Sequence, residues 1–309
     1  MTKQTTLFDA DTPQSDDVAG QRAHVATPPL TVARDGSTSG MKTPMRIALT
    51  MIAVSVLGLP TMATGQTPLA RNTVEALPRD LEIQLALSAL PRHLRDQATV
   101  YVLNPKKGFE VARQGTNGFH AFVARTGDDA MQGSWRLTKY PEDILYPISF
   151  DRAGAKANMR VFFDIAEMQA KGTPAEDVKR TIQERFKTNY YKSPERAGVS
   201  YMLSPILRSY VNPDDNDTVL TANFPHVMYY APNVSNDAVG GAMPSHEEMQ
   251  YAMAHGRWRT APHPFVIHNG PHAYMVQQLG PIERDAVNNE SQPMLDRLCK
   301  MKKAWCLPQ

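Results

Sequence analysis

Apolar residues recur at helical spacing in residues 74–95, VEALPRDLEIQLALSALPRHLR. One stripe with four-residue spacing is formed by Leu77, Leu81, Leu85 and Ala89. This spacing places side chains on one face of an α-helix. Pro78 suits a first turn, and Pro91 marks an end or a kink. The pattern predicts a helix at the start of the folded part.

Three short runs with the character of strands follow, at 99–103, 108–113 and 119–125. They are rich in β-branched and aromatic residues, and the linkers between them are short and contain turn residues. Strands that follow one another through short turns pair in series. We therefore expect an antiparallel meander here.

Residues 153–190 have the clearest helical pattern. Apolar positions recur at helical spacing up to Gly172, and Thr173-Pro174 is typical of the start of a second helix. A DNA-binding helix-turn-helix also consists of two helices joined by a short turn, but this pattern is unspecific. The better interpretation is a helical pair packed on a sheet.

The chain becomes rich in strands again after residue 198. We expect strands within 199–211, 219–230, 264–268 and 272–277, a short helix at 245–254 with Ser245 as its cap, and a terminal helix at 293–303. The predicted fold class is α+β: a single domain with an antiparallel meander-type sheet, a helical pair packed on it and an N-terminal helix.

Residues 41–65 have the pattern of a cleavable signal peptide. Lys42 and Arg46 precede the uncharged apolar run 47–59, and Ala63-Thr64-Gly65 supplies the small residues that a signal peptidase accepts. Spanning a bilayer takes about 20 apolar residues, so this run is too short for a permanent anchor. We expect a periplasmic or secreted protein, with signal peptidase as a partner during export.

Residues 1–40 are polar and show no apolar periodicity. Such a segment buries too little surface to order itself. The preferred interpretation is that translation starts at Met41 and that residues 1–40 are not made; the alternative is a genuine disordered leader. In either case residues 66–309 form the expected single globular α+β domain.

Composition restricts the partners. The net charge is +2 and 42% of the residues are hydrophobic. A nearly neutral globular chain gives no reason to expect nucleic acid as its partner.

The two cysteines, Cys299 and Cys306, are seven positions apart. On one continuous helix they would be separated by about 10 Å, too far for a disulfide. An oxidising compartment permits a bridge only if the helix stops between them. We place a structural disulfide ahead of free thiols.

Five of the nine histidines lie between residues 246 and 272, and the stretch HPFVIHNGPHAY holds three of them. If 269–271 is a three-residue hairpin loop, His268 and His272 lie opposite each other, with Cβ atoms about 5 Å apart. A two-residue turn would instead pair Ile267 with His272. The first arrangement would let both rings reach one zinc or copper ion, or one substrate proton.

Other residues are candidates to complete such a site. His226 is the third candidate metal ligand, and Glu247 or Glu248 is a candidate general base. The opposing interpretation is that these histidines cap turns or bond to backbone carbonyls.

Two functions follow from these alternatives. The preferred hypothesis is an exported, non-catalytic protein that binds a small ligand or a metal, or serves an envelope role. The other is a metal-assisted or histidine-based hydrolase that uses His268 and His272, with His272, Glu247 and Glu248 as candidate catalytic residues.

Overall fold

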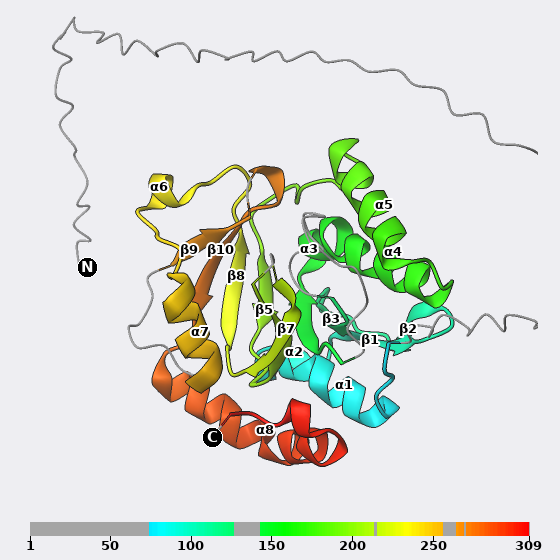
Figure 1. The fold of residues 1–309 in the computed structure, drawn as a ribbon, viewed down its shortest axis with the longest axis vertical. Coiled ribbons are helices and arrows are strands. Elements are labelled where there is room, and N and C mark those ends of the chain that lie inside the picture. Colours follow the sequence, from blue (N-terminus) through cyan, green and yellow to red (C-terminus); the bar gives the residue numbers. More distant parts are fainter. Residues whose placement is uncertain (1–73, 127–142, 213–214, 256–263, 269, 309) are drawn as a thin grey trace, which may run out of the picture. The chain divides into compact units, whose positions relative to one another are not determined.

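Helices and antiparallel strands share the chain in the computed structural model, which describes residues 74–126, 143–212, 215–255, 264–268 and 270–308 (Figure 1). All of them belong to one compact unit within Thr64–Gln309. The predicted α+β class with antiparallel sheets is confirmed. The expected leader and signal peptide lie outside the described residues. Within the described ranges, no helix has the length and apolar character that crossing a membrane requires.

The N-terminal helix is present as α1 (Arg79–Ser88), followed by the single turn α2 (Arg92–Arg95). Pro78 and Pro91 precede the two helices as their N-caps, because proline suits the position where a helix begins. Glu82 ties α1 to the first sheet from inside the protein. Its Oε1 accepts hydrogen bonds from the buried Arg125 guanidinium at 3.2 Å and from the Leu103 amide at 3.0 Å.

The first sheet has the strand order β2-β1-β3-β4. Its strands are β1 (Thr99–Asn104), β2 (Gly108–Arg113), β3 (His120–Ala124) and β4 (Tyr146–Phe150). Strands β1 and β2 form the expected antiparallel hairpin, and β3 pairs antiparallel with β4.

One pair in this sheet departs from the predicted serial meander, because β3 pairs with β1 and runs parallel to it. The linker after β2 crosses the start of β1 instead of folding back beside β2. There the Thr116 amide donates to the Gln97 carbonyl at 2.7 Å. A Cβ at Gly115 would lie 2.2 Å from the carbonyl carbon of Ala98, so only glycine permits this crossing.

The predicted helical pair lies on this sheet as α4 (Met159–Ala170) and α5 (Ala175–Lys187), preceded by the short α3 (Arg152–Ala157). Figure 1 shows these helices in green beside β1, β2 and β3. Phe162, Ile165 and Val178 of the pair share one buried cluster with Phe122 and Phe150 of the sheet. The opposite face of the sheet packs against α1 and the C-terminal helix.

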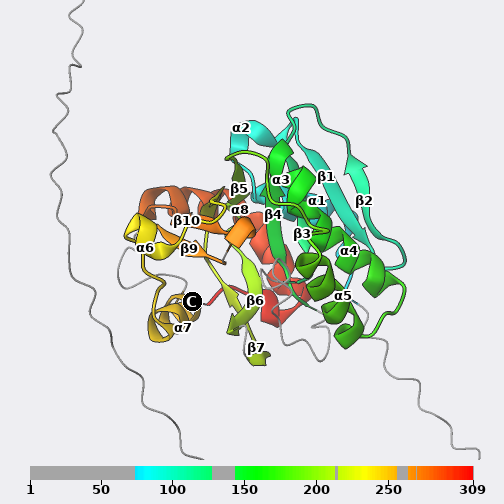
Figure 2. The same cartoon turned by 90° about the horizontal axis from the view of Figure 1, so that it is seen from above.

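The second sheet has the order β5-β8-β10-β9, and all its pairs are antiparallel. Its strands are β5 (Val199–Met202), β8 (His226–Tyr230), β9 (Phe265–Ile267) and β10 (Tyr274–Gln278). A separate hairpin is formed by β6 (Leu207–Asn212) and β7 (Asp215–Ala222). In Figure 2 the strands of the second sheet and the hairpin lie to one side of β1–β4.

The remaining helices are α6 (Asn236–Val239), α7 (His246–His255) and α8 (Pro281–Met301), with 3₁₀ turns η2 (Gly270–His272) and η3 (Lys303–Trp305). Helix α7 is capped by Ser245 as predicted, since the Glu248 amide donates to its hydroxyl at 3.1 Å. Helix α8 begins twelve residues before the predicted helix and includes Pro293. It ends between the cysteines, and Cys299 and Cys306 form a disulfide with a Cα–Cα distance of 4.4 Å.

Candidate functional site

His226 lies apart from the other two histidines proposed as metal ligands. It opens β8, where it pairs with Gln278 at the end of β10, whereas Tyr274 at the start of β10 pairs with Tyr230. Four residues along a strand correspond to about 13 Å. His226 Nδ1 lies 2.7 Å from the Phe224 carbonyl oxygen, and the two rings pack at 4.5 Å. The sheet therefore does not bring His226 to the end where His272 lies.

His268 follows β9 with a left-handed backbone, φ 63°. Its Nε2 is enclosed and has no hydrogen-bond partner among the described residues. Burial lowers the pKa of this imidazole to about 4, so the ring is neutral at pH 7. Its ring meets that of Tyr274 edge-on at a centroid distance of 6.1 Å.

His272 is buried, and both of its ring nitrogens have contacts. Nδ1 lies 3.3 Å from Asn158 Oδ1, and Nε2 lies 3.3 Å from the Tyr191 carbonyl oxygen. The Phe186 ring packs edge-on against it at 5.2 Å. Burial is the main cause of its lowered pKa, and the nearby His268 lowers it further. A metal ion could bind this ring only by replacing one of its two contacts.

The connection between the two histidines follows neither predicted hairpin. The last residue of β9, Ile267, pairs with Tyr274, so both His268 and His272 lie in the loop between the strands. The 3₁₀ turn at Gly270–His272 lengthens this loop, and the Ala273 amide closes it on the Gly270 carbonyl at 3.3 Å. The two histidines therefore do not form a cross-strand pair, and neither the three-residue nor the two-residue turn is present.

Glu247 and Glu248 lie in the first turn of α7, which packs against the β6–β7 hairpin. Across the described part of the chain, His, Cys, Asp and Glu residues form no group of three that could hold a metal ion. Among the described residues, the five candidates therefore form no three-ligand group of the kind that zinc or copper would require.

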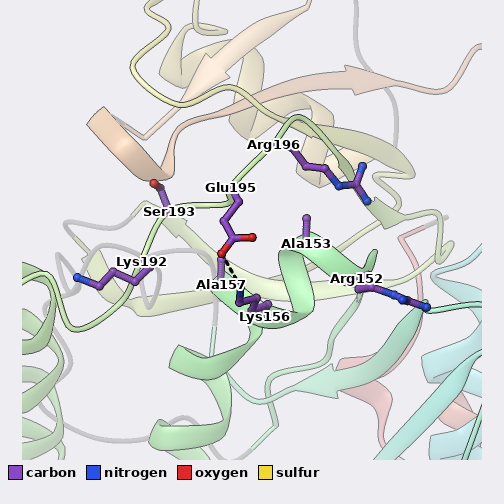
Figure 3. A pocket seen from close by; sticks show the side chains of 8 residues that line it. All are labelled: Arg152, Ala153, Lys156, Ala157, Lys192, Ser193, Glu195 and Arg196. Atoms are coloured by element: carbon purple, nitrogen blue, oxygen red, sulfur yellow. Dashed lines mark hydrogen bonds and ion pairs between the residues drawn. The ribbon is translucent and has the colours of Figure 1, made fainter.

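A pocket of about 350 Å³ lies elsewhere, between α3 and the segment that joins α5 to β5 (Figure 3). It is lined by Arg152, Ala153, Lys156, Ala157, Lys192, Ser193, Glu195 and Arg196. Four of these side chains are basic and one is acidic, so the pocket carries a positive charge. None of the five candidate residues named above lines it.

The single acid of the pocket, Glu195, points toward Lys156 and forms an ion pair with it (Figure 3). The hydrogen bond from Lys156 holds the pKa of this carboxyl below its usual range. The other three cations, Arg152, Lys192 and Arg196, have no ion-pair partner among the residues that the structure describes. All three are exposed, and in Figure 3 they extend in different directions, Lys192 to one side of the pocket and Arg152 and Arg196 to the other.

The α3 wall of the pocket is fixed by Asp151, its N-cap. Asp151 Oδ1 accepts from the Gly154 amide at 2.9 Å and from the Tyr230 hydroxyl at 3.2 Å. The Tyr230 hydroxyl also lies 2.9 Å from the Val199 carbonyl oxygen. A Cβ at Gly154 would lie 1.8 Å from the same hydroxyl oxygen, so a glycine is needed where tyrosine reaches the cap. This wall of the pocket is thus anchored to both sheets.

Sequence reasoning missed this pocket because its two walls are about 40 residues apart in the chain. Each contributes two scattered cations, RAGAK at 152–156 and KSPER at 192–196, and neither segment matches a binding motif. The sequence signal that could have indicated the pocket is weak, since each segment merely contains more basic than acidic residues.

Comparison with known proteins gives no relationship: no family model, no curated protein and no solved structure matches this chain.

Proposed function

We propose that the protein is exported, is non-catalytic, and binds a small anionic ligand in the pocket between α3 and the 192–196 segment. The observation that carries this proposal is the charge of the lining: four basic side chains, three of them without an ion-pair partner in the described structure, against one acid.

The chemistry of the lining favours a carboxylate or phosphate group. Arginine presents a planar fork of donors that matches both groups, and lysine contributes a compact positive charge. A volume of about 350 Å³ suits a small molecule, because ligand pockets range from roughly 300 to 1,000 Å³. The lining supplies donors and charge, whereas the histidines that would transfer protons lie outside it. Binding is therefore the function that these residues support.

Export is supported by two independent features. The apolar run 47–59 follows Lys42 and Arg46 and precedes small residues, the order found in a cleavable signal peptide. The disulfide between Cys299 and Cys306 suits an oxidising compartment.

Calorimetric titration with citrate and with inorganic phosphate tests the ligand proposal. Arg196→Gln removes a donor and a charge, so it should weaken citrate binding at least tenfold, since a hydrogen bond to a charged group is worth about 1.5–3 kcal/mol and each 1.4 kcal/mol is a factor of about ten. Glu195→Gln removes the competing carboxylate and frees Lys156, so it should strengthen binding. Lys106→Gln, an exposed cation in the β1–β2 hairpin, is the matched control and should change nothing.

The opposite signs of the two pocket variants make this test decisive. A site for a cation would show weaker binding in Glu195→Gln, and a nonspecific charge effect would make Lys106→Gln resemble Arg196→Gln. Either result, or wild-type protein that binds neither anion, would falsify the proposal.

Mass spectrometry of the protein from its native host tests export. The product in the periplasm or medium should begin near Gln66. Protein that retains residues 41–65 and fractionates with the cytosol would reject export while leaving the pocket proposal intact.

A further inference from the structure

We infer that His272 is the positioning residue of this pocket: its ring joins the two walls and sets the spacing at which the pocket cations meet an anion. The inference rests on the proposed function and assigns to His272 a role other than metal ligation or catalysis.

The contacts of the ring place it at the junction of both walls. Asn158 directly follows Ala157, the last pocket residue of α3, and Tyr191 directly precedes Lys192, the first pocket residue of the other wall. The two ring nitrogens of His272 lie 3.3 Å from Asn158 Oδ1 and from the Tyr191 carbonyl oxygen. One rigid imidazole thus spans the two segments.

Other contacts hold both sides of this bridge in place. Tyr191 is buried, its hydroxyl donates to Asp164 at 2.9 Å, and its ring packs against Phe186 at 4.8 Å. Asn158 is buried at the junction of α3 and α4, where its backbone N–H donates to the Gly154 carbonyl at 2.7 Å. The ring of His272 therefore connects two rigid points.

Within the described structure, the direct link across the pocket mouth is the ion pair of Lys156 with Glu195. Both side chains are more than two-thirds exposed, and an ion pair that is this exposed contributes little to holding two segments together. The buried His272 bridge is thus a stronger constraint on the distance between the walls than this ion pair, and it acts together with the hydrogen bonds between Asp151 and Val199 at the end of the pocket.

A neutral imidazole can satisfy both contacts of this position. Its Nε2–H donates to the Tyr191 carbonyl. Its Nδ1 accepts from the side-chain Nδ2 of Asn158 when the side-chain amide is rotated by 180° about χ2, which exchanges Oδ1 and Nδ2. Glutamine, which also has one donor and one acceptor end, is accordingly the conservative replacement. Phenylalanine fills the same space and makes neither contact.

The test compares citrate affinity with stability in four variants. His272→Phe should lower citrate affinity at least tenfold, and His272→Gln should recover part of the loss. Asn158→Ala should weaken binding as well, and the double variant should lose little more than His272→Phe alone, because both changes break the same bridge. Val276→Ala, a buried change in β10 away from the pocket, is the control for lost stability.

The results separate this inference from the proposed function. If wild-type protein binds citrate and Glu195→Gln strengthens binding, but His272→Phe and Asn158→Ala bind as wild type does, only the positioning role is rejected. It is also rejected if Val276→Ala loses as much affinity as His272→Phe at equal loss of stability. If wild-type protein binds neither citrate nor phosphate, both conclusions fall.

Discussion

His268 combines two unfavourable features in one residue: a left-handed backbone at φ 63° and an enclosed ring nitrogen without a hydrogen-bond partner in the described structure. A left-handed conformation costs roughly 1–2 kcal/mol for a residue other than glycine, although asparagine tolerates it best. The unpartnered nitrogen adds a cost of its own, because burial without a hydrogen bond removes its contact with water. The packing of the rest of the fold must therefore offset the conformational cost of His268.

The lowered pKa of His268 makes the stability of the fold depend on pH. Between about pH 4, the folded pKa, and pH 6.5, the model value, the unfolded chain binds a proton that the folded chain does not. Stability should therefore fall by about 3 kcal/mol as the pH falls through this window, at 1.36 kcal/mol per pKa unit. His272, whose pKa is also lowered, adds a change of the same sign.

Replacement of His268 by asparagine removes the titrating ring and keeps the backbone conformation, because asparagine tolerates the left-handed region and does not titrate. The variant therefore isolates the contribution of the imidazole to the pH dependence of stability. In urea unfolding at pH 7 and pH 4.5, His268→Asn should lose markedly less stability on acidification than wild type. His93→Asn, at an exposed position, is the control and should follow wild type. Equal acid sensitivity in wild type and His268→Asn would contradict the prediction.

At the scale of elements, α8 shows how a helix can form without an apolar stripe along its whole length. Its buried residues, Ser291, Met294, Leu295 and Leu298, all lie in its second half, and Ile282 near its start is 82% exposed. The predicted helix began at Pro293 because only from there does the sequence show residues that need burial. The first half continues the same helix in contact with solvent.

The turn after α8 is held by a disulfide and by one buried side chain. Trp305 is buried, and its Nε1 donates to the Asp143 carbonyl at 3.1 Å. The disulfide closes the short loop that carries it, with a sequence separation of 7. Closing a loop of this length stabilises the folded state by roughly 2–3 kcal/mol, by restricting the unfolded chain.

Reduction should therefore lower the free energy of unfolding by roughly 2–3 kcal/mol, measured in urea with and without dithiothreitol. The Cys299→Ser, Cys306→Ser double variant should have the same free energy of unfolding as the reduced protein, and dithiothreitol should not change it. A wild-type unfolding midpoint that does not move with dithiothreitol would contradict this.

At the scale of the whole described unit, the two four-stranded sheets meet along β4 and β5. At one end the Asp151 amide, which follows β4, donates to the Val199 carbonyl of β5 at 3.1 Å. Before the other end of β4, Leu145 exchanges two backbone hydrogen bonds with Arg208 of the β6–β7 hairpin, not with β5. Between them, side chains replace the backbone ladder. The Ser149 hydroxyl lies 3.0 Å from the Tyr201 carbonyl oxygen and 3.2 Å from the Tyr201 amide nitrogen.

Ser149→Ala should accordingly cost about 2–3 kcal/mol of stability, because it leaves two backbone groups of Tyr201 without their partner in the interior. The matched control is Ser88→Ala, another buried serine, whose hydroxyl donates to the Leu85 carbonyl within its own helix at 2.7 Å. Its cost should be about 1 kcal/mol or less. Equal losses in urea unfolding would mean that Ser149 does not join the sheets.

Patterns that act over short distances in the chain predicted much of this fold. The α1 stripe, the α4–α5 pair, the β1–β2 hairpin and the cap at Ser245 were all predicted, because each depends on residues within a few turns of one another. The sequence also predicted that a disulfide between Cys299 and Cys306 requires the helix to end between them, because this follows from helical geometry alone.

Contacts between distant segments were decided only by the tertiary structure. The parallel pairing of β3 with β1, the separation of His226 from His272, and the meeting of residues 152–156 with 192–196 all depend on how segments far apart in sequence pack together. Local periodicity reports which face of an element is buried, not which element it meets. For this reason the sequence alone predicted many of the helices and strands and singled out His272, whereas only the packing showed that its ring contacts residues next to both walls of a basic pocket.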